Sequence, residues 1–150
     1  MNPCRFVLAC IGMLLASRIE LSAQCTPFGF GCPGGGQLSC ATPPQIGTTW
    51  LLCQVPTCPT NKLMLLGNCS STPFHFTQPP ACATCPSCYL DLVPVYVSVF
   101  WSGLGCLGLP IPNNLGLIGG VFCVQNVCTG MQGTNTCICL STTMRVTLFR

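Results

Sequence analysis

The sequence predicts an all-β fold, a single antiparallel β-sandwich of Ig-like or Greek-key type that is stapled by disulfides. Three observations predict this fold. The segments between turns are rich in β-branched and aromatic residues, which favour strands. Fourteen prolines and sixteen glycines divide the chain into pieces that are too short for an amphipathic helix. The sixteen cysteines are far more than an ordinary globular chain contains, which is typical of exported domains held by disulfides.

The amino-terminal segment has the layout of a signal peptide, which we expect to span residues 1–24. Arg5 precedes an apolar run over 6–16, and Ser22 and Ala23 supply small residues for cleavage. A membrane-spanning helix needs about twenty apolar residues, so a run of about eleven favours a cleaved leader over a retained anchor. Residues 25–150 then form the secreted domain, and a membrane is contacted only through an uncleaved signal.

Removal of the leader leaves fourteen cysteines, an even number that predicts a disulfide framework. Thiols at this density oxidise outside the reducing cytosol. The spacing of the cysteines does not determine which of them pair, so every connectivity stays open at this point. The disulfide candidates are Cys25, Cys32, Cys40, Cys53, Cys58, Cys69, Cys82, Cys85, Cys88, Cys106, Cys123, Cys128, Cys137 and Cys139.

The first clear strands follow a glycine-rich turn at 31–36 (GCPGGG). Residues 48–55 (TTWLLCQV) and 62–66 (KLMLL) are rich in residues that favour strands, and the turn signal PTCPTN at 56–61 separates them. Several of the predicted strands are apolar on both sides of the alternation. Such strands are usually covered on both faces, as in the inner part of a sandwich.

The middle of the chain predicts two strands, at 89–93 and 95–101, after a turn at 79–88 (PPACATCPSC). Pro94 lies between them. Because proline has no N–H to donate to a strand ladder, it predicts a break or a sheet edge at this position.

The last third of the chain connects the sheets and closes the sandwich. The prolines in 109–112 (LPIP) hold that stretch extended, and the two asparagines that follow favour a turn. This pattern predicts a crossover between sheets. Strands are predicted after it at 121–127 and 144–149, with a turn signal at 133–135 between them.

The predicted secreted domain carries only four charged side chains and a formal charge of +2. Binding of nucleic acid or of an anionic membrane surface depends on clustered basic residues, so both are disfavoured. Glycoside hydrolysis usually needs two carboxylates, and Asp91 is the sole acidic side chain after residue 24. The expected partner is therefore an extracellular protein or polysaccharide. The four charged residues are Lys62, Asp91, Arg145 and Arg150.

The segment from Cys82 to Cys88 has the sharpest spacing in the chain, a C-x-x-C-x-x-C pattern. Such a pattern fits zinc or an iron–sulfur cluster, and Cys85 with Cys88 resembles the redox pair of thioredoxin-like proteins. We favour structural disulfides because a strand pattern follows Cys88, whereas a reactive thiol needs a helix N-terminus. Cys137 and Cys139 are too close in sequence to pair readily with each other, so we expect them to reach different strands.

Catalytic residues are not predicted, and we expect a protein that is not an enzyme and holds no cofactor or metal. His75, Asp91 and one of many serines contain the residue types of a catalytic triad, but the chain has no G-x-S-x-G elbow. His75 lies between Phe74 and Phe76, where it more simply fills a strand or loop position.

Aromatic residues in the predicted strands suggest a speculative ligand-binding face for carbohydrate. The alternative is that these aromatic side chains belong to the core, since all of them lie in apolar strands. The candidates are Trp50, Tyr89, Tyr96 and Trp101.

The order of several short motifs resembles that of a family of small secreted β-domains of unassigned function, common in planctomycete-type bacteria. The chain contains an FGFGCPG start, a PQIG segment, an LLG strand end, and IPNN followed by LIG and FCVQ before a closing RVTL strand. These motifs are distributed over most of the predicted secreted domain. The resemblance implies an extracellular β-domain without catalytic residues. The abundance of cysteine departs from the family pattern. The matching stretches are 28–34, 44–47, 65–67, 111–119, 122–125 and 145–148.

Three functional hypotheses follow from the sequence. The leading one is a secreted, non-enzymatic domain with a structural or interaction role at the cell surface or in the extracellular matrix. The second is a module that binds carbohydrate or another ligand through exposed aromatic side chains. The third is an extracytoplasmic thiol–disulfide exchange protein that acts through Cys85 and Cys88.

Overall fold

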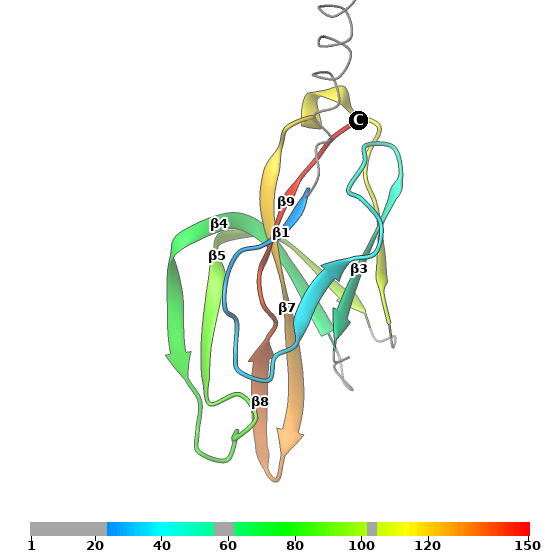
Figure 1. Cartoon of the computed structure of the whole chain (residues 1–150). Helices are drawn as coiled ribbons and strands as arrows, with labels where there is room; N and C mark the ends of the chain where they lie inside the picture. Colours follow the sequence, from blue (N-terminus) through cyan, green and yellow to red (C-terminus); the bar gives the residue numbers. More distant parts are fainter. Residues whose placement is uncertain (1–23, 56–61, 102–104) are drawn as a thin grey trace, which may run out of the picture.

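The computed structural model of the chain describes residues 24–55, 62–101 and 105–150. Its strands form two antiparallel sheets that face each other, which confirms the predicted disulfide-stapled β-sandwich (Figure 1). The predicted signal peptide and Cys58 lie outside the described residues. Within the described part of the chain, no helix is long and apolar enough to cross a membrane.

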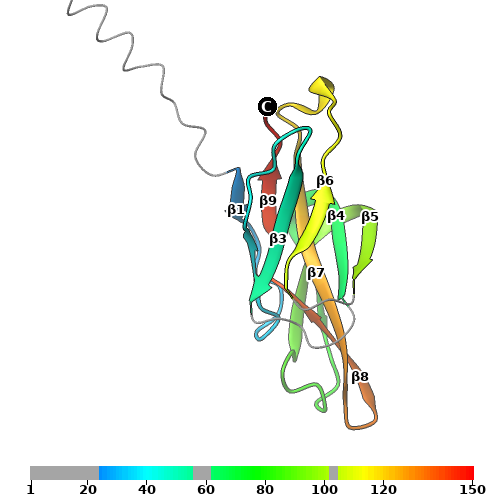
Figure 2. The ribbon, with the colours of Figure 1, turned by 90° about the vertical axis from the view of Figure 1, so that its right-hand side faces the viewer.

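The smaller sheet has three strands in the order β2-β3-β6. The central strand β3 spans Thr49–Val55 and pairs with β2 (Gln37–Cys40) on one side and β6 (Leu107–Pro110) on the other. The side chains of β3 alternate between buried and more exposed positions, so one face of this sheet is directed inward. Figure 2 shows β3 and β6 in front of the larger sheet.

The larger sheet has six strands and contains both ends of the described chain. Its path runs β1-β9-β7-β4-β5, and β8 pairs with the second half of β7. The strands of this sheet are β1 (Cys25–Pro27), β4 (Lys62–Thr77), β5 (Ser87–Trp101), β7 (Val121–Gln132), β8 (Asn135–Leu140) and β9 (Met144–Thr147).

The main hydrophobic core fills the space between the two sheets. Trp50 and Leu52 of β3 meet Met64 of β4 and Val124 of β7, and all four are almost fully buried. Residues 123–126 of β7 are buried on both faces of the strand, as the sequence predicts for doubly covered strands. The remaining core residues are Leu38, Ile46, Ile111, Met144, Val146 and Leu148.

Strands β4 and β5 are much longer than the sequence predicts. Of the two outcomes predicted for Pro94, the sheet edge is confirmed, because β5 is an edge strand of the larger sheet. The strand does not break there, and it continues through a cis Val93–Pro94 bond with a shift in register opposite Gly67. A Cβ at Gly67 would lie 2.3 Å from the Pro94 carbonyl oxygen, so only glycine allows this close crossing. Past this point β4 no longer pairs with β7, and the outer half of the β4–β5 hairpin extends away from the sandwich (Figure 1).

A second, smaller core lies between the outer halves of two hairpins, β4–β5 and β7–β8. Cys32, Cys85, Cys88 and Leu140 are buried there, and Phe76 packs against them. Two disulfides, Cys32–Cys88 and Cys85–Cys139, therefore supply much of the packing in this half of the molecule, where the main core does not reach.

The crossover that the sequence predicts is confirmed. The chain leaves the smaller sheet at the end of β6, forms a 3-10 turn at Leu115–Leu117 (η1), and enters the larger sheet at Val121. Asn114 caps this turn, because its side-chain oxygen accepts a hydrogen bond from the Gly116 N–H at 3.0 Å.

Candidate functional site

Twelve of the fourteen candidate cysteines form disulfides, so the predicted framework is confirmed for them. Cys58 lies outside the described residues. Cys128 is buried, and its Sγ lies 3.6 Å from Nε2 of Gln54. The six bridges are Cys25–Cys40, Cys32–Cys88, Cys53–Cys106, Cys69–Cys123, Cys82–Cys137 and Cys85–Cys139.

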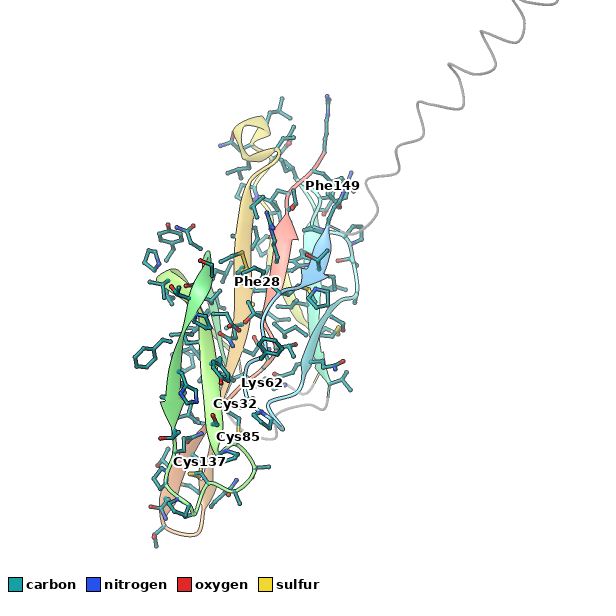
Figure 3. All side chains as sticks on the ribbon, turned by 60° about the vertical axis from the view of Figure 1, so that its left-hand side comes forward. Phe28, Cys32, Lys62, Cys85, Cys137 and Phe149 are labelled. Atoms are coloured by element: carbon teal, nitrogen blue, oxygen red, sulfur yellow. A yellow bond between two sulfur atoms is a disulfide. The ribbon has the colours of Figure 1, made fainter. Side chains whose placement is uncertain are left out.

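The C-x-x-C-x-x-C segment is structural. Cys85 and Cys88 do not pair with each other, and both are fully buried, so the redox pair that thiol exchange requires is absent. Figure 3 shows Cys32, Cys85 and Cys137 close together in the half of the molecule that contains the smaller core. The expectation that Cys137 and Cys139 reach different strands is wrong, because the β7–β8 hairpin packs against a single turn that holds both of their partners.

The four aromatic candidates have different positions. The prediction that Trp50 binds a ligand is wrong, because its side chain is 1% exposed and lies on the inner face of β3. Its ring packs edge-to-face against Phe122, with 6.1 Å between the ring centroids. Tyr96 is 62% exposed on the edge strand β5, where its hydroxyl accepts a hydrogen bond from Asn68 at 2.6 Å. Tyr89 is half-buried and lines a groove. The side chain of Trp101 lies outside what the structure describes.

An open groove of about 550 Å³ lies beside Tyr89, and we call it the aromatic groove. The residues that line it are Phe30, Gly31, Cys32, Pro33, Pro73 and Tyr89. Phe30 is 82% exposed, so its ring is accessible from solvent at the edge of the groove.

Covalent and backbone contacts fix the shape of the aromatic groove. The Cys32–Cys88 disulfide joins the loop that carries Phe30 to the strand that carries Tyr89. The Tyr89 N–H also donates to the Gly31 carbonyl at 2.9 Å, and the Cys32 N–H donates to the Leu140 carbonyl at 2.9 Å. The groove is therefore preorganised, which reduces the entropy lost when a ligand binds.

A polar pair borders the groove on β4 and β5. Nε2 of His75 lies 2.7 Å from Oγ of Ser87, and the His75 ring lies 4.7 Å from the Tyr89 ring, measured between centroids. His75 occupies an exposed strand position, in agreement with the prediction that it fills a strand or loop position. The carboxylate of Asp91 is instead held by Thr143 and Gln125, so these contacts assemble no Ser-His-Asp triad.

A second polar site is buried under the loop at 28–31, and we call it the acid–amide cluster. It consists of Asp91, Gln125 and Thr143, which are 3%, 0% and 1% exposed. Oγ1 of Thr143 lies 2.5 Å from Oδ2 of Asp91, and Nε2 of Gln125 lies 3.5 Å from the same oxygen. A Cβ on Gly29 would lie 2.0 Å from that oxygen, so the loop backbone covers the carboxylate directly.

A third polar group lies between the sheets. Nδ2 of Asn126 donates to Oε1 of Gln54 at 3.0 Å, and Nε2 of Gln54 donates to the Gly35 carbonyl at 2.7 Å. Lys62, directly opposite Cys128 in the β4–β7 register, is fully buried on the same side of the sheet. These contacts link β7 to β3 across the core and hold the loop at 31–36 in place.

The sequence alone does not mark the groove residues Phe30, Pro33 and Pro73, nor the roles of Gln125 and Thr143. A signal for the buried clusters is present in the sequence. The adjacent polar residues Gln125 and Asn126 lie inside an otherwise apolar predicted strand, and a buried polar side chain needs a partner. No family model, curated protein or solved structure matches the chain.

Proposed function

We propose that this chain is a secreted, non-enzymatic interaction domain that binds an extracellular partner at the cell surface or in the extracellular matrix. The observation that carries the proposal is the aromatic groove, an exposed apolar surface fixed by a disulfide. Its lining is mainly apolar with a small number of polar groups nearby, which is the usual composition of binding sites.

The disulfides and the charge support an extracellular role. Six bridges are typical of proteins that work outside the reducing cytosol. The low net charge of the predicted secreted domain gives little repulsion between neighbouring molecules, which suits a protein in an assembly. The resemblance of its motifs to those of small secreted bacterial domains favours the same location.

The leading candidate partner is a protein. Further exposed apolar side chains lie along β4 and β5, outside the groove. Exposed apolar surface is a common feature of protein contact sites. The exposed residues on these two strands are Phe74, Val93, Val95, Tyr96 and Phe100.

The second candidate partner is a polysaccharide. One observation favours it: the Tyr89 ring lies beside His75 and Ser87, so an apolar platform and hydrogen-bonding groups are adjacent. Sugars bind such surfaces by placing an apolar ring face on an aromatic side chain while their hydroxyls find polar partners.

The test is a binding assay with matched tyrosine variants. Labelled exported protein is added to producing cells that lack the gene, and the bound fraction is measured. We expect Tyr89→Ala to weaken binding by about tenfold or more, the loss typical of a central aromatic anchor. Tyr96→Ala removes an equally large tyrosine outside the groove and should change binding by less than about twofold. Equal binding by Tyr89→Ala and the unmodified protein would refute the proposal.

Treatment of the cells separates the two partner classes. Protease treatment that abolishes binding indicates a protein partner, whereas periodate oxidation that abolishes it indicates a polysaccharide. Disulfide content and circular dichroism of both tyrosine variants must match those of the unmodified protein, so that a loss of binding reports the groove and not the fold.

A further inference from the structure

The acid–amide cluster combines a nucleophile, a base and an amide in one buried place. We propose that Thr143 and Gln125 react to form an intramolecular ester between their side chains, with Asp91 as the proton-transfer group. The ester is a modification site that joins β7 to Thr143, the residue before β9, and it does not depend on the proposed binding function.

A shared contact brings the two reacting side chains to one place. The β7–β9 ladder ends at the Val124–Met144 pair, and Gln125 and Thr143 are the next residues along the two segments. Both side chains contact Oδ2 of Asp91, Oγ1 of Thr143 at 2.5 Å and Nε2 of Gln125 at 3.5 Å. The hydroxyl and the amide therefore lie on the same side of the sheet, around one carboxylate oxygen.

The nucleophile is the Thr143 hydroxyl. It donates a hydrogen bond to Oδ2 of Asp91 at 2.5 Å, a short distance for a hydroxyl and a carboxylate. A weak nucleophile is activated when a base within hydrogen-bond reach accepts its proton. Because the pair is buried, no solvent competes for that proton at Oδ2.

The electrophile is the side-chain amide of Gln125. Its Oε1 accepts a hydrogen bond from the Asp91 backbone N–H at 3.2 Å, which stabilises negative charge on this oxygen during attack. The amide is fixed in orientation, because Nε2 donates to the carbonyl oxygens of Tyr89 at 2.8 Å and Ser141 at 3.0 Å.

Three acceptors surround Nε2 of Gln125, but a planar amide nitrogen has only two hydrogens. The third acceptor is Oδ2 of Asp91, at 3.5 Å. A protonated leaving nitrogen in the tetrahedral intermediate has three hydrogens and satisfies all three acceptors. The surroundings of this nitrogen therefore fit the intermediate better than the starting amide, which is the condition for accelerating a reaction.

The reaction needs no additional reactant. Oγ1 of Thr143 forms a bond with Cδ of Gln125 while Asp91 accepts the hydroxyl proton. The tetrahedral intermediate collapses, the Cδ–Nε2 bond breaks, and the proton passes from Asp91 to the departing nitrogen. The products are one ester and one molecule of ammonia, and Asp91 returns to its initial state.

Burial also protects the product. The cluster is covered by the 28–31 loop, whose Gly29 lies directly against Asp91, and an added Cβ would collide with the carboxylate. Water that would hydrolyse the ester is therefore excluded from the site.

The mass of the unmodified protein tests the proposal without any variant. We expect the full exported chain, after reduction and alkylation, to weigh one ammonia less than its sequence. Peptide mapping should recover 125 and 143 in one cross-linked fragment, and mild alkali or hydroxylamine should separate them. A folded, fully bridged protein with the mass of its sequence would overturn the proposal.

Other losses of ammonia are distinguished by the same map. Cyclisation of Gln24 at a new amino terminus leaves 125 and 143 in separate fragments. An amide between the buried Lys62 and Asn126 would survive alkali. Either result in place of the ester would also overturn the proposal.

Variants assign the roles. Thr143→Val and Gln125→Ala should restore the mass predicted from the variant sequence, and Thr143→Ser, which keeps the hydroxyl, should retain the loss of ammonia. Thr142→Ala removes a neighbouring hydroxyl that contacts the Leu38 N–H and should still form the ester. Asp91→Asn should slow formation at least tenfold in a time course of refolding. Formation at the unmodified rate in that variant would refute the role of Asp91.

Discussion

The paired bridges Cys82–Cys137 and Cys85–Cys139 allow a quantitative test of how the disulfide network stabilises the fold. Each closes a sequence separation of more than fifty residues, 55 and 54. Taken alone, a loop of that length predicts a stabilisation of about 4 kcal/mol from the restricted unfolded chain. The two bridges, however, connect the same two segments, so they are not independent.

With one of these bridges intact, the other closes a circuit of only about six residues through its neighbour. We therefore expect Cys82→Ala/Cys137→Ala to cost about 2 kcal/mol, and Cys85→Ala/Cys139→Ala about the same. When neither bridge is present, the first one restored closes its shortest circuit through Cys69–Cys123. That circuit contains about 27 residues for Cys82–Cys137 and about 32 for Cys85–Cys139. The fourfold variant should then lose about 6 kcal/mol in total, more than the sum of the two pairs.

The assay is equilibrium unfolding in guanidinium chloride without reductant, followed by tryptophan fluorescence and circular dichroism. Removal of Cys25–Cys40 is the matched control, because this bridge closes a separate loop of 15 residues and should cost about 3 kcal/mol, additive with either pair. A cost of about 4 kcal/mol for each single pair, or a fourfold variant equal to the sum of the two pairs, would refute this coupling between the bridges.

Three further predictions concern the fold. The unreduced protein should weigh at least twelve hydrogens less than its reduced form, two for each of the six bridges, and a smaller difference contradicts the network. Gly67→Ala should lower the free energy of unfolding by about 1–3 kcal/mol, because its Cβ would lie 2.3 Å from the Pro94 oxygen. Gly108→Ala, whose nearest neighbour is a threonine methyl at 3.3 Å, should cost less than about 1 kcal/mol in the same denaturation experiment. Trp50→Ala should cost about 3–5 kcal/mol, and a loss below about 1 kcal/mol would contradict its place in the core.

Some strands could be predicted because their pattern is local. The β3 segment, the first part of β7 and the proline-asparagine crossover all carry turn signals and strand formers within a few residues. The continuity of β5 through Pro94 could not be predicted, because it depends on Gly67 in another strand leaving room for the Pro94 carbonyl. The short strands β1, β2, β6 and β8 carry little pattern of their own and are defined by the strands they pair with.

In the candidate site too, the local sequence pattern predicts the strands, while tertiary packing decides which side chains are exposed. Trp50 and Tyr89 both lie in apolar strands, yet Trp50 is in the core and Tyr89 lines the groove. The difference arises because β3 has its inner face against the larger sheet, whereas the outer half of β5 has left the sandwich. Strand propensity does not contain that information.

The sequence by itself determined the β class, the disulfide framework and the crossover, because composition, cysteine parity and turn residues act locally or through the chemistry of the compartment. The tertiary structure decided which cysteines pair, which aromatic side chains are exposed, and that Asp91, Gln125 and Thr143 meet in one buried cluster. These residues are far apart along the chain. Their contacts are set by sheet order and register, which depend on the packing of all strands together.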